Sequence, residues 1–149
     1  MSYKQWFDKH AYKHKMIVDS LSDLSDDELI DYFDYDNMKS KQPDFCPLYS
    51  KGKKCHPIDD LNCYLCACPY FRFDDNGLYE ENNKIRYSVC SIDAKGKEDF
   101  IKENSIHQGC TNCILPHQKS FIQKHFNRDW MKVMKNVILF DTTDKIKIK

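Results

Sequence analysis

The sequence predicts an α+β fold in which helices flank a small, irregular, cysteine-rich core. Three observations lead to this prediction. All eight cysteines lie between Cys46 and Cys113, apolar residues recur at helical spacing in both flanks, and the last residues alternate between apolar and charged side chains as short strands do. A length of 149 residues fits a single domain, 1–149, with segments 1–42, 43–118 and 119–149.

Residues 1–42 are predicted to form two helices. The first has a face of residues at helical spacing, namely Trp6, His10, His14, Ile17, Val18 and Leu21. The second begins at Ser25-Asp26-Asp27-Glu28, a capping box in which Ser25 caps the helix and Glu28 reaches back. We expect this helix to end before Pro43, because proline disfavours a helical conformation in the residue that precedes it.

Residues 119–149 are predicted to form one helix followed by short strands. The helix starts near Ser120, and its buried stripe is expected to contain Ile122, Phe126, Trp130, Val133 and Val137. The opposite face is expected to be solvated and carries Lys124, Arg128, Lys132 and Lys135. Strands are expected at 138–140 and 146–149, joined by a hairpin around 141–144.

The spacing of the cysteines predicts metal ligation. Two residues separate Cys63 from Cys66 and Cys110 from Cys113, and such a pair, here called a knuckle, lets a tight turn aim two thiolates at one ion. The first residues contain no apolar leader, and no run reaches the roughly 18 apolar residues of a membrane span. We therefore expect a cytoplasmic, reducing setting, in which dense cysteines are metal ligands rather than disulfides or buried structural thiols.

All eight cysteines are candidate ligands, enough for two four-thiolate sites: Cys46, Cys55, Cys63, Cys66, Cys68, Cys90, Cys110 and Cys113. We expect the two knuckles to share one ion, because two facing knuckles commonly close a tetrahedron. The other four thiols would then form the second site. Cys90 is the expected exchangeable position, since no other cysteine lies within nineteen residues of it on either side.

Zinc is the expected ion, because the two knuckles are well separated along the chain. Iron–sulfur clusters are the alternative. The run from Cys63 through Cys66 to Cys68 places three thiols within six residues, more than one zinc ion accommodates comfortably. The Cys-Pro pairs at Cys46 and Cys68 are also typical of ferredoxins.

Several polar residues beside the cysteines have candidate roles. His117 follows Cys113 by four residues and is either a ligand or a residue that orients one through a hydrogen bond. His56 adjoins Cys55, and the orienting role is expected there because neighbouring residues seldom bind one ion together. Asn62 is expected to hold the turn of the first knuckle through its side chain. His10 and His14 have ligand spacing, but we interpret them as a solvated or core-edge pair.

Four short stretches resemble the cysteine-rich small domain family, a zinc-finger-like group described as metal-binding. In chain order they read F-C-P, C-H-P, N-C-Y-L-C-A-C-P-Y and G-C-T-N-C-I-L-P-H. The resemblance covers about residues 44–118, with all eight cysteines and the closing His117. Some members of this family are fused to proteins of cobalamin biosynthesis. The resemblance thus implies metal binding for this chain.

Charge argues against several classes of function. The formal net charge is zero, so no overall field attracts nucleic acid or a membrane surface. Residues 19–36 contain eight acidic residues and no Lys or Arg, whereas residues 117–149 contain eight basic and three acidic ones. We interpret these two segments as solvated faces that attract each other within the fold.

The sequence contains no phosphate-binding glycine loop, no Ser/His/Asp order and no carboxylate pair with assignable roles. We therefore expect a non-enzymatic metal-binding protein that serves as an interaction or accessory module, with metal ions and a protein as partners. The alternative is an iron–sulfur protein that transfers electrons or sulfur in cofactor biosynthesis.

Overall fold

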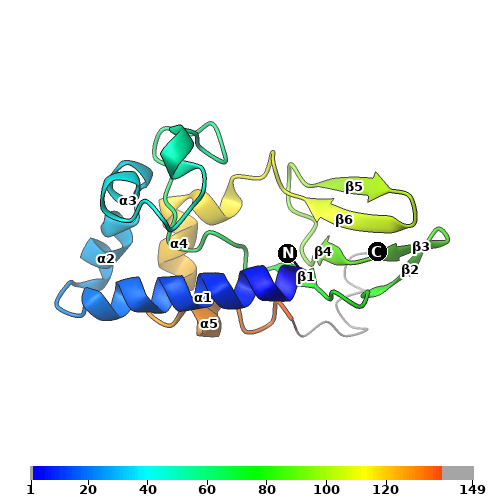
Figure 1. The fold of residues 1–149 in the computed structure, drawn as a ribbon, viewed down its shortest axis with the longest axis horizontal. Helices are drawn as coiled ribbons and strands as arrows, with labels where there is room; N and C mark the ends of the chain where they lie inside the picture. The colour runs from blue at the N-terminus through cyan, green and yellow to red at the C-terminus, as the bar shows by residue number, and fades with distance from the viewer. Residues whose placement is uncertain (1, 139–149) are drawn as a thin grey trace. The chain divides into compact units, whose positions relative to one another are not determined.

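A computed structural model describes residues 2–138 of the chain (Figure 1). Its contacts divide these residues into two compact units. Residues 2–7, 68–113 and 134–138 form what we call the sheet unit, and residues 8–67 and 114–133 form the helical unit. Helices and small mixed sheets together confirm the α+β class. Whether the chain behaves as the expected single domain stays a prediction.

The helices and turns of 3₁₀ type are α1 (Tyr3–Ser20), α2 (Asp26–Tyr32), α3 (Tyr35–Lys41), η1 (Tyr49–Lys51), η2 (Leu115–His117), α4 (Lys119–His125) and α5 (Trp130–Val133). The strands are β1 (Phe71–Phe73), β2 (Tyr79–Glu81), β3 (Lys84–Arg86), β4 (Ser88–Cys90), β5 (Glu98–Lys102) and β6 (Ser105–Gly109). Among the described helices, none is long and apolar enough to cross a membrane.

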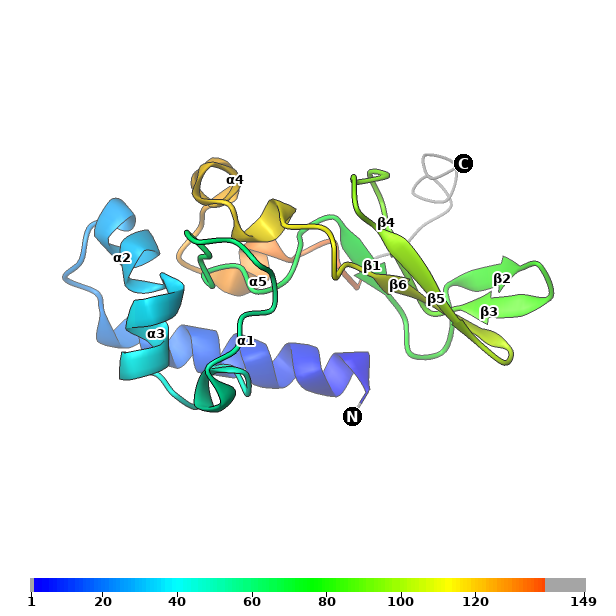
Figure 2. The same cartoon turned by 90° about the horizontal axis from the view of Figure 1, so that it is seen from above.

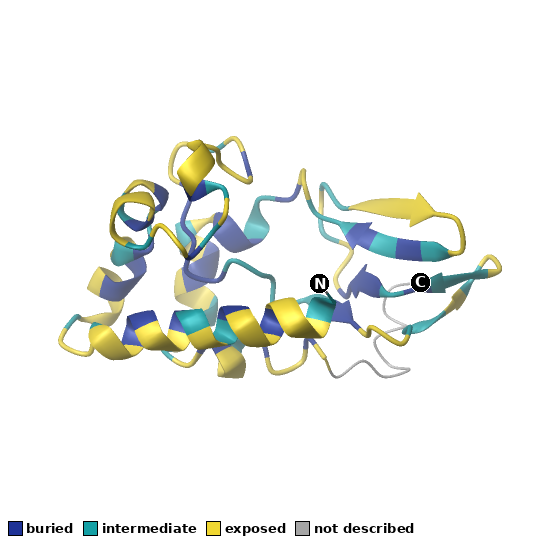
Figure 3. Cartoon of the chain, viewed as in Figure 1, coloured by how far each residue is buried: buried dark blue, intermediate teal, exposed yellow. Residues whose placement is uncertain are grey.

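The first predicted helix is confirmed as α1, and buried positions recur along one side of it (Figure 3). Ile17 and Val18 are buried as the spacing predicted, but Leu21 lies beyond the end of the helix and is only half-buried. Trp6 was placed on the wrong face, because it is 41% exposed while its neighbour Phe7 is buried.

The capping box at Ser25 is also confirmed. The Ser25 side chain accepts a hydrogen bond from the Glu28 backbone N–H at 3.2 Å, and the Ser25 N–H donates to the Glu28 carboxylate at 3.0 Å. The helix does not continue toward Pro43, however. It ends at Tyr32, and α3 starts at Tyr35.

A distant segment explains this interruption. Asp34 forms an isolated β-bridge with Asn62, the Phe33 carbonyl accepts from the Cys63 N–H at 2.8 Å, and the Tyr35 N–H donates to the Leu61 carbonyl at 3.0 Å. These backbone groups are therefore used by residues 61–63 instead of by a continuous helix. The view in Figure 2 separates α2 from α3 clearly.

The predicted C-terminal helix is broken into α4 and α5. Asn127 and Asp129 form local turns, since their side chains accept from the Asp129 and Met131 backbone N–H groups at 2.8 and 3.0 Å. Ile122, Trp130 and Val137 are buried as expected, whereas Phe126 and Val133 are half-buried. On the opposite face Lys124, Lys132 and Lys135 are exposed and Arg128 is half-buried.

The expected attraction between the acidic and basic segments is confirmed within the helical unit. Lys119 lies 2.7 Å from the Asp31 carboxylate, and Arg128 lies 3.0 Å from Asp26. These ion pairs join α4 and the turn after it to α2. Exposed pairs of this kind contribute at most about 1 kcal/mol each, so they orient the helices more than they stabilise them.

The sheet unit corrects the prediction that residues 43–118 are irregular throughout. Strands β1 and β4 pair antiparallel, and a second sheet has the order β2-β3-β6-β5 with β3 parallel to β6. Most strands have only three residues, which explains why period-two patterns were not recognised. Strand β5 is exposed along its length, while β6 alternates between half-buried and buried positions (Figure 3).

Of the strands expected near the C-terminus, Ile138 is described and lies in an exposed turn. The rest of the predicted strand pair, residues 139–149, lies outside the described residues.

Candidate metal centre

The eight cysteines form no disulfide, and they divide equally between the two units. The helical unit contains Cys46, Cys55, Cys63 and Cys66, here called the helical set. The sheet unit contains Cys68, Cys90, Cys110 and Cys113, here called the sheet set. The chain passes from one set to the other at Ala67, inside the crowded run of three thiols.

Electrostatic coupling shows that the thiols of the helical set lie near one another. Burial, followed by the charges of Cys55 and Cys46, raises the pKa of the Cys63 thiol to about 12, although the Tyr49 hydroxyl lowers it. Burial and then Cys63, Cys46 and Cys55 also raise the pKa of Cys66. Because such interactions weaken with distance, these pKa shifts indicate that the four thiols share one region of the helical unit.

Local backbone structure holds the first knuckle in place. The Asn62 side chain accepts from the Tyr64 N–H at 2.9 Å, which confirms the expected turn. The same side chain donates to the Ile30 carbonyl and to the Asp34 carboxylate, each at 2.8 Å. Cys66 adopts a left-handed conformation with φ of 43°, uncommon for a residue other than glycine. The knuckle is thus anchored to the region where α2 ends.

Tyr49 belongs to the same neighbourhood but was not singled out in the sequence. It opens η1, and its N–H donates to the Cys46 carbonyl at 3.1 Å. Its hydroxyl is buried and lies beside the Cys63 thiol. Burial, then the charge of Cys63, raises the pKa of this hydroxyl.

The sheet set shows the same coupling. Burial raises the pKa of Cys68 to about 12, and the charges of Cys90, Cys110 and Cys113 add to it against a lowering hydrogen bond from the Tyr70 backbone. Burial, then Cys113 and Cys90, raises the pKa of Cys110 to about 11. These four thiols therefore also form one neighbourhood.

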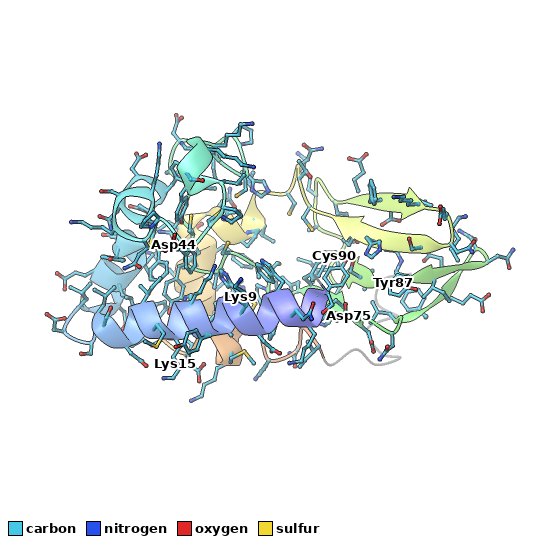
Figure 4. All side chains as sticks on the ribbon, viewed as in Figure 1. Lys9, Lys15, Asp44, Asp75, Tyr87 and Cys90 are labelled. Carbon is cyan, nitrogen blue, oxygen red and sulfur yellow. The ribbon has the colours of Figure 1, made fainter. Side chains whose placement is uncertain are left out.

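Several strands and turns position the sheet set. Cys90 ends β4 opposite Phe71 of β1 (Figure 4), and its N–H donates to the Gln108 side chain at 3.0 Å. The second knuckle closes with a bond from the Cys113 N–H to the Cys110 carbonyl at 3.0 Å. Gly96 approaches this knuckle so closely that a Cβ would collide with the Asn112 carbonyl, and its φ is +90°.

A third group contains histidines. The ligand atoms of Cys55, His56 and His117 all lie within 4.8 Å of one another, and in residues 2–138 they are the one such trio of cysteine, histidine or carboxylate groups found. The Cys55 sulfur is 3.1 Å from His56 Nδ1 and 3.6 Å from His117 Nε2. In the described part of the chain, no three thiols of either four-thiol set lie this close together.

The orientation of His117 is determined by its backbone neighbours. Its Nδ1 lies 3.0 Å from the Asn62 carbonyl, which can only accept, so Nδ1 carries the proton and donates. The lone pair of the neutral ring is then on Nε2, the atom that faces Cys55. Burial lowers the pKa of His117, opposed by the hydrogen bond to Asn62, so the neutral ring is favoured. Metal-binding histidines commonly have this arrangement.

Cys63 and Cys66 belong to the helical set, and Cys110 and Cys113 belong to the sheet set. The shared site expected for the two knuckles stays a prediction. Cys90, the thiol expected to be exchangeable, is buried. Cys55 is the exposed thiol instead. Spacing along the chain could not reveal this, because β4 encloses Cys90 through its pairing with β1.

His10 and His14 are core residues, which corrects their interpretation as a solvated or core-edge pair. They are 4% and 0% exposed. The His14 Nε2 donates to the Tyr64 carbonyl at 2.9 Å, and its ring packs against Phe33 and Tyr64. Burial lowers the pKa of His10 to about 3 and that of His14 to about 4.

Comparison of the chain with models of known protein families, with curated proteins and with solved structures finds no match. The resemblance to the cysteine-rich small domain family therefore stays a prediction.

Proposed function

We propose that this chain is a metal-binding protein in which each four-thiol set holds one zinc ion in a structural site. The observation that supports this most is the equal division of the eight cysteines, four to each unit. Four thiolates are a complete ligand set for a tetrahedral structural zinc site. Each unit thus has the ligands for its own ion.

The electrostatics of both sets predict that metal binding is coupled to proton release. Burial and neighbouring thiols raise the pKa of Cys63 and Cys68 to about 12, so these thiols keep their protons at neutral pH when no ion is bound. A divalent cation replaces those protons and removes the repulsion between thiolates that would otherwise oppose ionisation. Metal binding should accordingly release protons and become weaker in acid.

The short strands of the sheet unit give the metal a structural role. The β1–β4 pair has three residues in each strand, below the usual strand length, and is short of backbone hydrogen bonds of its own. The sheet set includes Cys68 before β1, Cys90 at the end of β4 and Cys110 after β6. One ion bound by these residues would link three segments that few backbone bonds connect.

The protein is then an accessory or interaction module of a reducing, cytoplasmic compartment rather than an enzyme. The absence of disulfides among the eight cysteines fits that setting. Resemblance of residues 44–118 to the cysteine-rich small domain family supports the same proposal.

An iron–sulfur protein that transfers electrons or sulfur is the second candidate, because four thiolates in each unit also suit a cluster. In the sequence, the close spacing of Cys63, Cys66 and Cys68 favours iron–sulfur clusters over zinc. Cys68 belongs to the other set, so no site has to accommodate all three thiols. Zinc is therefore preferred.

Metal analysis and the visible spectrum of protein purified without oxygen test this proposal. Two structural zinc sites should give a colourless protein with about two tightly held zinc ions per chain. A brown protein with iron and sulfide would instead select clusters. Protein that folds fully after complete chelation, with no metal retained, would contradict both.

A further inference from the structure

We propose that Cys55, His56 and His117 form an additional metal site, open to solvent, for a divalent transition-metal ion such as Zn²⁺, Co²⁺ or Ni²⁺. This inference rests on the proposed function only in that Cys55 also belongs to the helical set. It assigns the two histidines as ligands, whereas the structural zinc sites need only thiolates.

The distances within the trio suit coordination. In a tetrahedral site with metal–nitrogen bonds of about 2.1 Å and metal–sulfur bonds of about 2.3 Å, ligand atoms lie about 3.4–3.8 Å apart. The Cys55 sulfur is 3.1 Å from His56 Nδ1 and 3.6 Å from His117 Nε2. Neighbouring residues seldom bind one ion together, but the ligand atoms of Cys55 and His56 already lie 3.1 Å apart. Only small side-chain movements would therefore be needed for one ion to contact all three atoms.

His117 is held in the orientation that a ligand needs. Besides the bond from Nδ1 to the Asn62 carbonyl at 3.0 Å, the Asn62 N–H donates to the His117 carbonyl at 3.2 Å. His117 is consequently connected to Asn62 by one bond from its imidazole and one to its backbone. The turn η2 positions the residue, with Pro116 in its first turn. Nε2 is left facing Cys55 as the donor atom.

The ligand types select the class of ion. Two imidazoles and one thiolate suit borderline transition metals and not Mg²⁺ or Ca²⁺, which prefer oxygen. Three protein ligands leave one position of a tetrahedron for water or an exogenous ligand, as in catalytic and exchangeable sites. Cys55 is exposed while His56 and His117 are buried, so this position is reached from the side of the thiol.

Cys55 connects the additional site to the helical set. A thiolate sulfur has three lone pairs and can bind two ions, so Cys55 need not leave one site to serve the other. Loss of either histidine should then remove the additional ion alone. Loss of the Cys55 thiolate should affect both ions of the helical unit.

The proposal is tested by titrating the whole chain with Zn²⁺, and separately with Co²⁺, in competition with a chelator of moderate strength. Wild type should bind about three ions, of which about two resist the chelator and one exchanges. His56→Gln and His117→Gln should lower the affinity for the exchangeable ion by at least about tenfold and leave the other two ions bound. His125→Gln, a histidine of α4 in the same unit and outside the trio, is the control and should behave as wild type.

The outcomes separate the two proposals. A wild type that binds two ions and no third overturns the additional site, and so does retention of the exchangeable ion in both histidine variants. If the thiol sets bind nothing but one ion is lost from His117→Gln, the additional site stands and the proposed structural zinc sites fail. Because His117 and His56 are both buried, circular dichroism checks that each variant folds. If one variant does not fold, the other decides.

Discussion

Asn62 connects several segments of the helical unit. Its side chain bonds to Ile30 near the end of α2, to Asp34 before α3 and to the first knuckle, and its backbone bonds to His117. All of these groups are buried or partly buried. A single amide thus connects the interruption between α2 and α3 to the candidate metal ligands.

Asn62→Ala should lower the free energy of unfolding by about 2–4 kcal/mol, because three hydrogen-bonding groups lose their partner. Asn76→Ala, in an exposed turn, is the matched control and should change it by less than about 0.5 kcal/mol. Denaturant unfolding of metal-saturated protein measures both. A loss no larger than that of the control would show that Asn62 does not hold the knuckle.

His14 predicts a pH dependence of stability. Its pKa in the folded protein is about 4, below the ordinary value of 6.5, because burial disfavours the charged ring. Between pH 6.5 and 4 the unfolded chain binds a proton that the folded chain does not, so stability is complete above pH 6.5 and falls as the pH drops through this window. The loss attributable to His14 should reach about 3 kcal/mol.

His14→Gln should reduce that slope, since glutamine keeps a donor for the Tyr64 carbonyl but does not titrate. Unfolding free energies at several pH values, compared between variant and wild type, isolate the contribution of His14 from metal loss in acid. Identical slopes in the two proteins would contradict a buried, neutral His14.

At the scale of elements, α5 is short but its first residue anchors the helical unit. Trp130 is 2% exposed, and its Nε1 donates to the Leu65 carbonyl at 2.6 Å. The carbonyl lies one residue before Cys66, so the indole supports the first knuckle from the core side. Four helical residues could not hold this position by intrinsic propensity, and tertiary packing must do so.

Trp130→Ala should therefore cost about 3–5 kcal/mol, the range for emptying a large buried site. Trp6→Ala provides the comparison within the same chain, because Trp6 is 41% exposed and should cost much less. Thermal or denaturant unfolding of the two variants distinguishes them. Equal losses would mean that the burial of Trp130 is not what stabilises the unit.

At the scale of the whole molecule, the two four-thiol sets predict that each unit depends on its own ion. Cys63→Ser should lose the tightly held zinc of the helical unit, and Cys68→Ser that of the sheet unit. Each loss removes on the order of 10 kcal/mol of coupled folding free energy from one unit. Metal content and hydrogen exchange of the two variants measure this. Loss of both ions in Cys63→Ser would support the shared knuckle site predicted from spacing.

The sequence by itself determined the features that depend on neighbouring residues. Helix α1, the capping box at Ser25 and the turn at Asn62 all follow from contacts a few residues apart, and the cysteine content predicts metal ligands without reference to the fold. Attraction between the acidic and basic segments was also predictable, because the excess charges are large enough to be seen in composition.

Only the tertiary structure decided which unit contains each cysteine and where the helices stop. The bridge between Asp34 and Asn62 ends α2, although neither residue disfavours a helix enough to predict it. Cys66 and Cys68 are two residues apart yet belong to different sets, while Cys55 and His117 meet from distant segments. The spacing of cysteines constrains which ligands one turn can present. Which ligands of distant segments meet that turn depends on long-range packing, and local sequence patterns do not report on it.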